Sequence, residues 1–348
     1  MLSEEFSRKL EEKHIPFFSS IELTSRCNLR CKFCYLEHSD RDELSTEEIK
    51  SYLDQLASLG SLFLCLTGGE PLLRQDFWDI AQHAHSLGFA LNLKTNGTLI
   101  DKKMADHLAR LNLYRVDISL LGATPEVHDG ITQVKGSLEK TISGVRFLRE
   151  RDIIVFLMST IVKENLHELI KIKKLAEKLG AHLATTPLLY PKNDSGQEPL
   201  KHRLNDEELA VYYRETLSPD LRILPCSDIH KDFLICQAGR TDISINSEGR
   251  LYPCLAFPWE VGDLRKESLQ NILKNSERLS FFRSLRGDEF KTCIGCRDSF
   301  LCARCSGLAY LEMGDMLGPS PENCRQTKIV REVSNEKEKS LQETQDEN

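Results

Sequence analysis

The decisive stretch reads Thr24-Ser25-Arg26-Cys27-Asn28-Leu29-Arg30-Cys31-Lys32-Phe33-Cys34-Tyr35. It places three cysteines at the spacing C-x3-C-x2-C, directly after the apolar run 17–23, which is typical of a strand. A tetrahedral zinc site uses four ligands, so three thiolates leave one position of the metal open. An iron–sulfur cluster held by three cysteines likewise keeps one iron free for a ligand that is not protein. The stretch therefore predicts a metal centre with an open position.

The bulk composition is that of an ordinary globular protein. The chain has 348 residues, long for one domain and comfortable for two, and its net charge of -7 argues against a nucleic-acid partner. No apolar run reaches the roughly 18–20 residues that a membrane span needs. The N-terminal residues 1–9 carry charges where a signal peptide has its apolar core. We therefore expect a cytoplasmic protein without a membrane partner.

The cysteines gather in two regions of the chain. Because the cytosol keeps thiols reduced, twelve cysteines indicate metal binding rather than disulfides. They occur at positions 27, 31, 34 and 65, and then, after a cysteine-free middle, at 226, 236, 254, 293, 296, 302, 305 and 324. This distribution predicts two metal-binding regions and is the first sign of two domains.

The region between residues 20 and 190 alternates strands with helices. Apolar runs predict strands at 20–23, 62–66, 90–94, 115–120, 153–161 and 182–188. Helical periodicity predicts helices at 45–59, 77–87, 102–111, 137–149 and 166–179, the first with a capping box of Ser45 and Glu48. The alternation predicts an α/β fold with a parallel sheet, either open and doubly wound or closed into a partial βα barrel.

Four segments of unusual composition follow successive predicted strands. The cysteine loop 27–34 follows the first strand, Gly68-Gly69-Glu70 the second and Thr95-Asn96-Gly97 the third, and Ser119 lies near the end of the fourth. Ligands of parallel α/β sheets bind at the carboxyl ends of the strands. We therefore expect these segments to share one site.

These motifs resemble those of radical S-adenosylmethionine (radical SAM) enzymes. Cys27-x3-Cys31-x2-Cys34, with Phe33 before the last cysteine, is similar to the signature of that family. The resemblance implies a partial (β/α)6 barrel in which the three thiolates hold a [4Fe–4S] cluster and S-adenosylmethionine binds the fourth iron. It also implies that an electron from the cluster cleaves this cofactor to a 5′-deoxyadenosyl radical, which abstracts hydrogen from the substrate.

The resemblance further implies contacts to S-adenosylmethionine. Gly68-Gly69-Glu70-Pro71 matches the second motif of the family: its glycines allow close approach to the ligand, and the loop binds the methionine amino group. Asn96 and Ser119 fall where family members contact the ribose or the carboxylate of the cofactor.

One position departs from the family pattern. Related enzymes often place an arginine three residues after a His-Asp pair, whereas here His128-Asp129 is followed by Thr132. Lys94 and Lys135 are the alternatives for neutralising the cofactor carboxylate, and the sequence does not rank them.

The later cysteines form a second pattern. It reads Cys236-x12-Gly249-x4-Cys254, then Cys293-x2-Cys296-x5-Cys302-x2-Cys305, then Cys324. This resembles the SPASM domain, a seven-cysteine extension of radical enzymes that modify peptides and proteins, although the family usually has a longer spacing before the sixth cysteine. The resemblance implies two auxiliary [4Fe–4S] clusters, with one ligand set of Cys236, Cys254 and Cys305 and another of Cys293, Cys296, Cys302 and Cys324. Cys226 is a candidate fourth ligand of the first set, and Cys65 is expected to be a buried, inert thiol.

Zinc is the alternative at both cysteine regions. Cys27, Cys31 and Cys34 would bind it with His38 as the fourth ligand, and paired C-x2-C motifs are a common zinc spacing. Gly68-Gly69-Glu70 at the next strand end favours the iron–sulfur interpretation.

The sequence divides into four parts. We predict a barrel at 1–190, a bridging segment at 191–232, a SPASM domain at 233–327 and a charged tail at 328–348 that is a frayed helix or disordered. A polar helix is expected at 205–215. Alternating residues on either side of Ser247-Glu248-Gly249 predict a hairpin at 241–252.

The function implied by this resemblance is that of a maturase of ribosomally made peptides, carrying out an oxidative cross-link, a decarboxylation or a related change. The stretches 186–194, 203–208 and 117–123 look like those of peptide maturases. Only 26 residues precede Cys27, so we expect either that a separate protein binds the leader peptide or that the substrate is recognised differently. An electron donor such as flavodoxin or ferredoxin is also implied.

Other functions remain open at this point. They are the oxidation of a sulfatase residue to formylglycine, radical oxidation of a small molecule, and a non-catalytic iron–sulfur or zinc protein. Formylglycine formation needs a general base near the barrel rim, for which the candidates are Asp117, Asp129, Tyr190 and Asp194.

Overall fold

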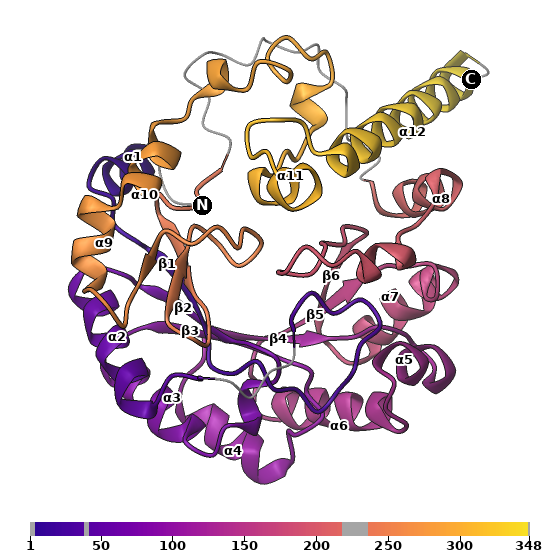
Figure 1. The fold of residues 1–348 in the computed structure, drawn as a ribbon. Helices are drawn as coiled ribbons and strands as arrows, with labels where there is room; N and C mark the ends of the chain where they lie inside the picture. The colour runs from indigo at the N-terminus through magenta and orange to yellow at the C-terminus, as the bar shows by residue number, and fades with distance from the viewer. Residues whose placement is uncertain (1–3, 38–41, 218–235, 347–348) are drawn as a thin grey trace.

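One curved sheet forms the centre of the molecule (Figure 1). The computed structural model describes residues 4–37, 42–217 and 236–346. The sheet has nine strands in the order β6-β5-β4-β3-β2-β1-β7-β8-β9. The strands are β1 (Phe18–Glu22), β2 (Phe63–Thr67), β3 (Ala90–Thr95), β4 (Arg115–Ser119), β5 (Val155–Thr160), β6 (His182–Thr186), β7 (Asp242–Ile245), β8 (Arg250–Tyr252) and β9 (Gly262–Asp263).

The strand order decides between the two predicted architectures. Strands β1 to β6 are parallel and pair in the order of the sequence, without the reversal that marks a doubly wound sheet. The fold is therefore the partial βα barrel. All six strands of this barrel were predicted from the sequence, with ends displaced by one or two residues.

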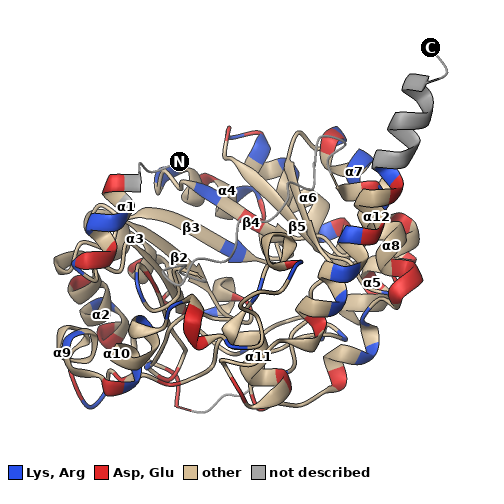
Figure 2. Cartoon of the chain, turned by 90° about the horizontal axis from the view of Figure 1, so that it is seen from above, with Lys and Arg blue, Asp and Glu red and all other residues tan. Residues whose placement is uncertain are grey.

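Helices cover the outer face of the curved sheet (Figure 1), and acidic and basic residues alternate along them (Figure 2). The barrel helices are α1 (Glu4–Glu12), α2 (Thr46–Ser58), α3 (Phe77–Ser86), α4 (Lys102–Arg110), α5 (Pro125–Thr132), α6 (Ser137–Arg149) and α7 (Leu169–Lys178). The later helices are α8 (Asp206–Thr216), α9 (Leu269–Asn275), α10 (Glu277–Ser284), α11 (Ser306–Met313) and α12 (Pro321–Asp346). No helix in the described ranges has the length and apolar character to cross a bilayer.

The five helices predicted between the strands are present, and the capping box of Ser45 and Glu48 is confirmed. The sequence analysis missed α5, which has only eight residues. Its periodicity is interrupted by Gly130, and such a short segment gives a weak helical signal.

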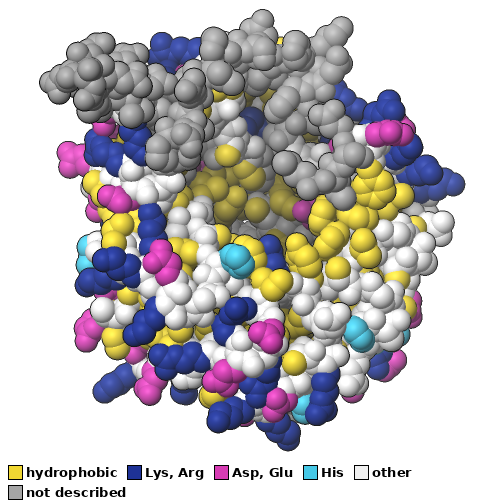
Figure 3. All heavy atoms as spheres, turned by 180° about the vertical axis from the view of Figure 1, so that it is seen from behind, with side chains coloured by type: hydrophobic (Ala, Val, Ile, Leu, Met, Phe, Trp, Pro, Cys, Tyr) yellow, Lys and Arg dark blue, Asp and Glu magenta, His cyan; other side chains and the backbone are white. Residues whose placement is uncertain are grey.

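Alternation along the strands separates the core from a polar interior. Residues such as Ile21, Leu66 and Leu93 point outward and are fully buried against the helices. Their neighbours Cys65 and Lys94 point to the inner face of the barrel. Cys65 accepts a hydrogen bond from Asn92 at 3.8 Å, and burial raises the pKa of its thiol to about 11. On the face opposite to the one seen in Figure 1, hydrophobic side chains surround a central hollow (Figure 3).

The predicted hairpin extends the barrel sheet. Strands β7 and β8 pair antiparallel, as expected, and β7 pairs in parallel with β1, so that Phe18 lies opposite Asp242. No pattern in the sequence indicates this second pairing. Its consequence is that the segments carrying Cys236 and Cys254 are fixed to the first strand of the barrel.

The charged tail is helical as far as Asp346, the last residue that the structure describes. Helix α12 packs along α8 (Figure 1), and Ile329 and Val333 are buried in the core. Tyr213 of α8 donates a hydrogen bond to Gln326 of α12 at 2.8 Å. Two apolar side chains and this polar contact order a segment whose composition alone indicates disorder.

We predict that Ile329→Ala destabilises the fold. The side chain is 4% exposed, and truncating a buried isoleucine costs about 2–5 kcal/mol of unfolding free energy. Urea denaturation followed by tryptophan fluorescence measures this loss. Glu332→Ala, on the exposed side of α12, is the control and should change the free energy by less than about 0.5 kcal/mol. Equal midpoints for both variants would mean that α12 is not part of the core.

Candidate active site

A cavity of about 400 Å³ lies at the carboxyl ends of the barrel strands. The cysteine loop contributes Cys27, Cys31 and Cys34 to its wall, and the next strands contribute Gly68, Asn96 and Ser119. The four segments that we expected to share one site therefore do so. Thr160 and Thr186 also line the cavity but were not predicted. The ends of the fifth and sixth strands would have revealed them, because all parallel strands end on the same rim.

The cysteine loop is held by backbone hydrogen bonds from two sides. The N–H groups of Gly69 and Glu70 donate to the carbonyls of Thr24 and Arg26, both at 2.8 Å. On the other side, Arg30 N–H donates to the Thr132 carbonyl at 3.0 Å. Glu43 adds an ion pair to Arg26 at 3.2 Å. The backbone of the loop is therefore fixed by tertiary contacts rather than by secondary structure of its own.

The two glycines of Gly68-Gly69 serve this contact. A Cβ at Gly69 would lie 2.3 Å from the Arg26 carbonyl oxygen, and one at Gly68 would lie 2.3 Å from that of Thr24. Gly68 also has φ +137°, which side chains rarely adopt. We expected these glycines to let the backbone approach a ligand. In the structure, the backbone that they approach is that of the cysteine loop.

Glu70 connects the ends of two strands. Its buried carboxylate accepts hydrogen bonds from Asn96 N–H and Thr95 hydroxyl at 2.7 Å each, and from Leu72 N–H at 3.1 Å. Burial raises its pKa to about 7, although these bonds act in the opposite direction. The expected contact of Glu70 to a cofactor amino group stays a prediction, since the carboxylate already has partners in the chain.

Asn96 connects the third strand end with the cysteine loop. Its Nδ2 donates to Asn28 Oδ1 at 2.8 Å and faces Cys27 Sγ at 3.8 Å. Leu29 N–H also donates to Cys27 Sγ, at 3.4 Å. Asn96 and Ser119 both line the cavity, where a ligand can reach them.

The position that departs from the family pattern lies at the same rim. Thr132 is buried, and its hydroxyl forms a hydrogen bond with that of Ser137 at 2.7 Å. Of the two lysines, Lys94 lines the cavity, whereas Lys135 is exposed and does not. Lys94 is the only lysine or arginine among the described lining residues. The structure therefore favours Lys94 as the cation of the site.

His128 is a lining residue that the sequence analysis named only as part of a motif. It is 1% exposed, and its Nδ1 accepts a hydrogen bond from Leu121 N–H at 3.1 Å. Burial lowers its pKa to about 4, so the imidazole is neutral at pH 7. A neutral His128 leaves Lys94 as the cation among the described lining side chains.

None of the four base candidates is supported by its surroundings. Asp117 lines the cavity but forms an ion pair with Arg115 at 2.9 Å. Asp129 accepts bonds from Gly136, Ser137 and Leu138 at the start of α6, and Asp194 lies in an exposed turn. Burial, together with nearby thiols, holds the pKa of Tyr190 well above its usual range.

The three thiols of the first loop interact with one another. Burial raises the pKa of Cys31 to about 12, and the neighbouring Cys34 and Cys27 add to the rise. Burial raises the pKa of Cys27 and Cys34 as well. A bound metal deprotonates a coordinating thiol outright. Three half-buried thiols at one cavity wall therefore fit a metal centre.

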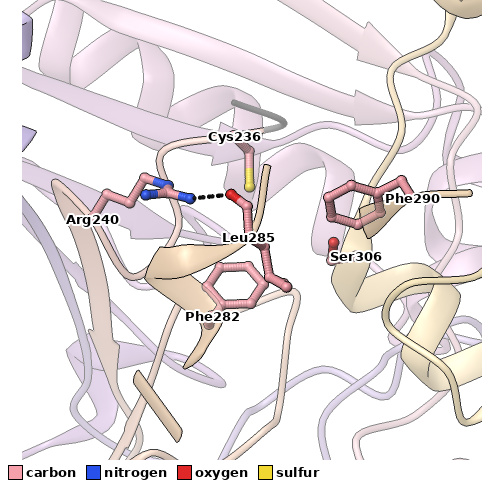
Figure 4. A pocket seen from close by; sticks show the side chains of 6 residues that line it. All are labelled: Cys236, Arg240, Phe282, Leu285, Phe290 and Ser306. Carbon is pink, nitrogen blue, oxygen red and sulfur yellow. Dashed lines mark hydrogen bonds between the residues drawn. The ribbon is translucent and has the colours of Figure 1, made fainter. Parts of the chain in front are cut away.

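Three of the later cysteines influence one another. Burial raises the pKa of Cys254, and Cys305 and Cys236 contribute to the rise. Cys236 lies at a small pocket that is lined by apolar side chains and by Arg240 and Ser306, the latter next to Cys305 in the chain (Figure 4). The assignment of these cysteines to one cluster stays a prediction.

The second set lies at the start of α12. Burial raises the pKa of Cys324, and Cys302, Cys293 and Cys296 contribute to the rise. Cys226 and His38 lie outside the described residues. The zinc alternative takes its fourth ligand at the first loop from His38, so the described residues do not test it.

Comparisons with known proteins agree with this organisation. Residues 21–176 match the Radical SAM superfamily, and residues 236–297 match SPASM, an iron–sulfur cluster-binding domain. The chain is 30% identical to an AdoMet-dependent heme synthase of Methanosarcina barkeri, over 88% of this chain and 95% of that protein. It is 29% identical to the mycofactocin maturase MftC of Mycobacterium tuberculosis, over 92% of this chain and 85% of that protein.

A solved structure has the same fold. SuiB of Streptococcus suis bound to S-adenosylmethionine matches with a TM-score of 0.69 at 19% identity, covering 91% of this chain and 80% of that chain.

We predict that Gly69→Ala prevents assembly of the first metal centre. The added Cβ meets the Arg26 carbonyl at 2.3 Å and must displace the backbone that carries Cys27. Iron and sulfide per chain after anaerobic reconstitution should fall by the content of about one cluster of three. Gly130→Ala is the matched control, because nothing lies within 4 Å of its Cβ. Full iron content in Gly69→Ala would show that this packing is dispensable.

Proposed function

The chain belongs to the radical SAM superfamily and carries a SPASM domain, and on this premise we propose that it is a maturase that oxidises a peptide. It is an enzyme that binds a [4Fe–4S] cluster with S-adenosylmethionine in the barrel and auxiliary iron–sulfur clusters in the SPASM domain. The identity of the ligands, the substrate and the reaction belong to the proposal.

The thiol sets of the structure supply the ligands in this proposal. Cys27, Cys31 and Cys34 hold the cluster of the barrel, and the cavity beside them holds the cofactor. Cys236, Cys254 and Cys305 hold one auxiliary cluster, and Cys293, Cys296, Cys302 and Cys324 hold the other. When bound, the first cluster and the cofactor supply a 5′-deoxyadenosyl radical for hydrogen abstraction.

The choice of a peptide as substrate rests on the unpaired outer edge of β6. β6 is the terminal strand of the sheet, and no other described strand pairs with its outer edge. All its residues are exposed or half-buried. Its last residue, Thr186, lines the cavity together with Leu188 and Leu189. Since an extended peptide can add to an exposed strand edge, this edge can deliver a peptide residue to the cavity.

The relatives support two substrate classes. The likeness to the maturase MftC extends over nearly the whole chain and favours a peptide. The likeness to the heme synthase is of equal extent and makes a haem precursor the second candidate. Formylglycine formation is less well supported, because that reaction wants a general base and the four candidates are all engaged elsewhere.

The proposal includes three partners. They are the precursor peptide, a separate protein that binds its leader, and an electron donor such as flavodoxin or ferredoxin.

The test uses the anaerobically reconstituted full chain with S-adenosylmethionine and a chemical reductant. The substrate to be added is a short cysteine-containing peptide encoded beside the gene. We expect the amount of 5′-deoxyadenosine released to rise with the amount of this peptide, and mass spectrometry should show that the peptide has lost hydrogen atoms. Cys27→Ala should abolish release of the nucleoside. Turnover of an iron porphyrin, or of a sulfatase peptide, in place of the encoded peptide would overturn the substrate assignment.

We further predict that Lys94 binds the carboxylate of the cofactor. A hydrogen bond to a charged group contributes about 1.5–3 kcal/mol, so Lys94→Gln should weaken S-adenosylmethionine binding about ten- to hundredfold. Isothermal titration of reconstituted protein measures the dissociation constant. Lys135→Gln makes the same chemical change outside the cavity and should leave it unaltered. An effect of equal size in both variants, or in neither, would argue against Lys94.

A further inference from the structure

Tyr190 connects the cavity with the first auxiliary thiol set. It follows β6 in the chain and lines the cavity. Its hydroxyl lies 4.0 Å from Cys305 Sγ, a residue 115 positions later in the sequence. Cys254 and Cys236 also contribute to the raised pKa of its phenol. One side chain thus contacts both the substrate cavity and a proposed cluster ligand.

Arg203 and its partners hold the segment of Tyr190 close to Cys305. Arg203 donates a hydrogen bond to the Leu189 carbonyl at 2.7 Å, next to Tyr190 in the chain. The same guanidinium forms an ion pair with Glu312 of α11 at 2.8 Å. Cys305 is the N-cap residue of α11. The segment of Tyr190 and the helix of Cys305 are therefore tied together through Arg203.

The Tyr190 hydroxyl acts as a donor at this position. An ordinary phenol has a pKa of about 10 and keeps its proton at neutral pH, so the hydroxyl can donate to Cys305 Sγ at 4.0 Å. Cys305 Sγ also accepts from Leu308 N–H at 3.4 Å. Phe282, Leu285 and Phe290 surround the neighbouring Cys236 (Figure 4). Hydrogen bonds are electrostatically stronger in such a low-dielectric environment.

Such a bond influences the reduction potential. A reduced cluster carries one more negative charge than the oxidised form, so a donor at a ligand sulfur stabilises the reduced form more. We propose that Tyr190 is a positioning residue whose hydroxyl donates to the Cys305 thiolate and raises the reduction potential of the auxiliary cluster nearest the cavity. This inference rests on the ligand set proposed above.

The test is a redox titration of the reconstituted full chain followed by electron paramagnetic resonance. Tyr190→Phe should shift the midpoint potential of one auxiliary cluster to a more negative value and leave the other unchanged. Tyr212→Phe is the matched control, because this hydroxyl contacts Thr185 and none of the described cysteines. An unchanged potential in Tyr190→Phe with full iron content would overturn the proposal.

A second variant covers the case in which Tyr190→Phe loses iron. Site-specific replacement of Tyr190 by 3,5-difluorotyrosine gives a more acidic phenol of nearly the same size. It should move the same potential in the positive direction, and no movement or a negative shift would overturn the proposal.

Cys305→Ala separates this inference from the ligand assignment. If it leaves all clusters in place, the ligand assignment has failed, and the inference fails with it. If it removes one auxiliary cluster while the Tyr190 variants leave the potentials unchanged, only the role of Tyr190 is overturned.

Discussion

The backbone contact between the cysteine loop and Gly68-Gly69-Glu70 is the constraint on which the site depends. The loop has no regular secondary structure, so its geometry comes from hydrogen bonds to neighbouring strand ends. These bonds require two backbones to approach within hydrogen-bond distance, and any side chain at positions 68 or 69 would occupy that space. The Glu70 carboxylate then accepts a hydrogen bond from Asn96 N–H, which connects the Gly68-Gly69-Glu70 segment to the end of β3. Three strand ends thereby become one rigid rim.

The second organising contact is the pairing of β1 with β7. It joins the barrel and the cysteine-rich region in one continuous sheet. Because β1 leads directly into the first cysteine loop, this pairing fixes the segments of Cys236 and Cys254 relative to that of Cys27.

The strand pattern explains why polar side chains line the inner face of the barrel. The apolar side of each strand is used against the helices, which leaves alternate polar residues on the inner face. Some of these are paired with one another, as Asp117 is with Arg115 and Asn92. Lys94 stands out among the lining residues because its charge faces the cavity. An anionic group in the cavity would therefore be directed to that position.

The βα alternation, the cysteine spacings and the placement of motifs at strand ends can be predicted from the sequence alone. Each of these is a local pattern, fixed by side-chain periodicity or by short separations along the chain. The folded chain is needed to find the partner of the glycines, the pairing of β1 with β7 and the contact of Tyr190 with Cys305, because those contacts join residues far apart in sequence. The tail shows the same division. Its composition indicates disorder. However, α12 packs against α8, and the burial of Ile329 and Val333 in the core stabilises the helix.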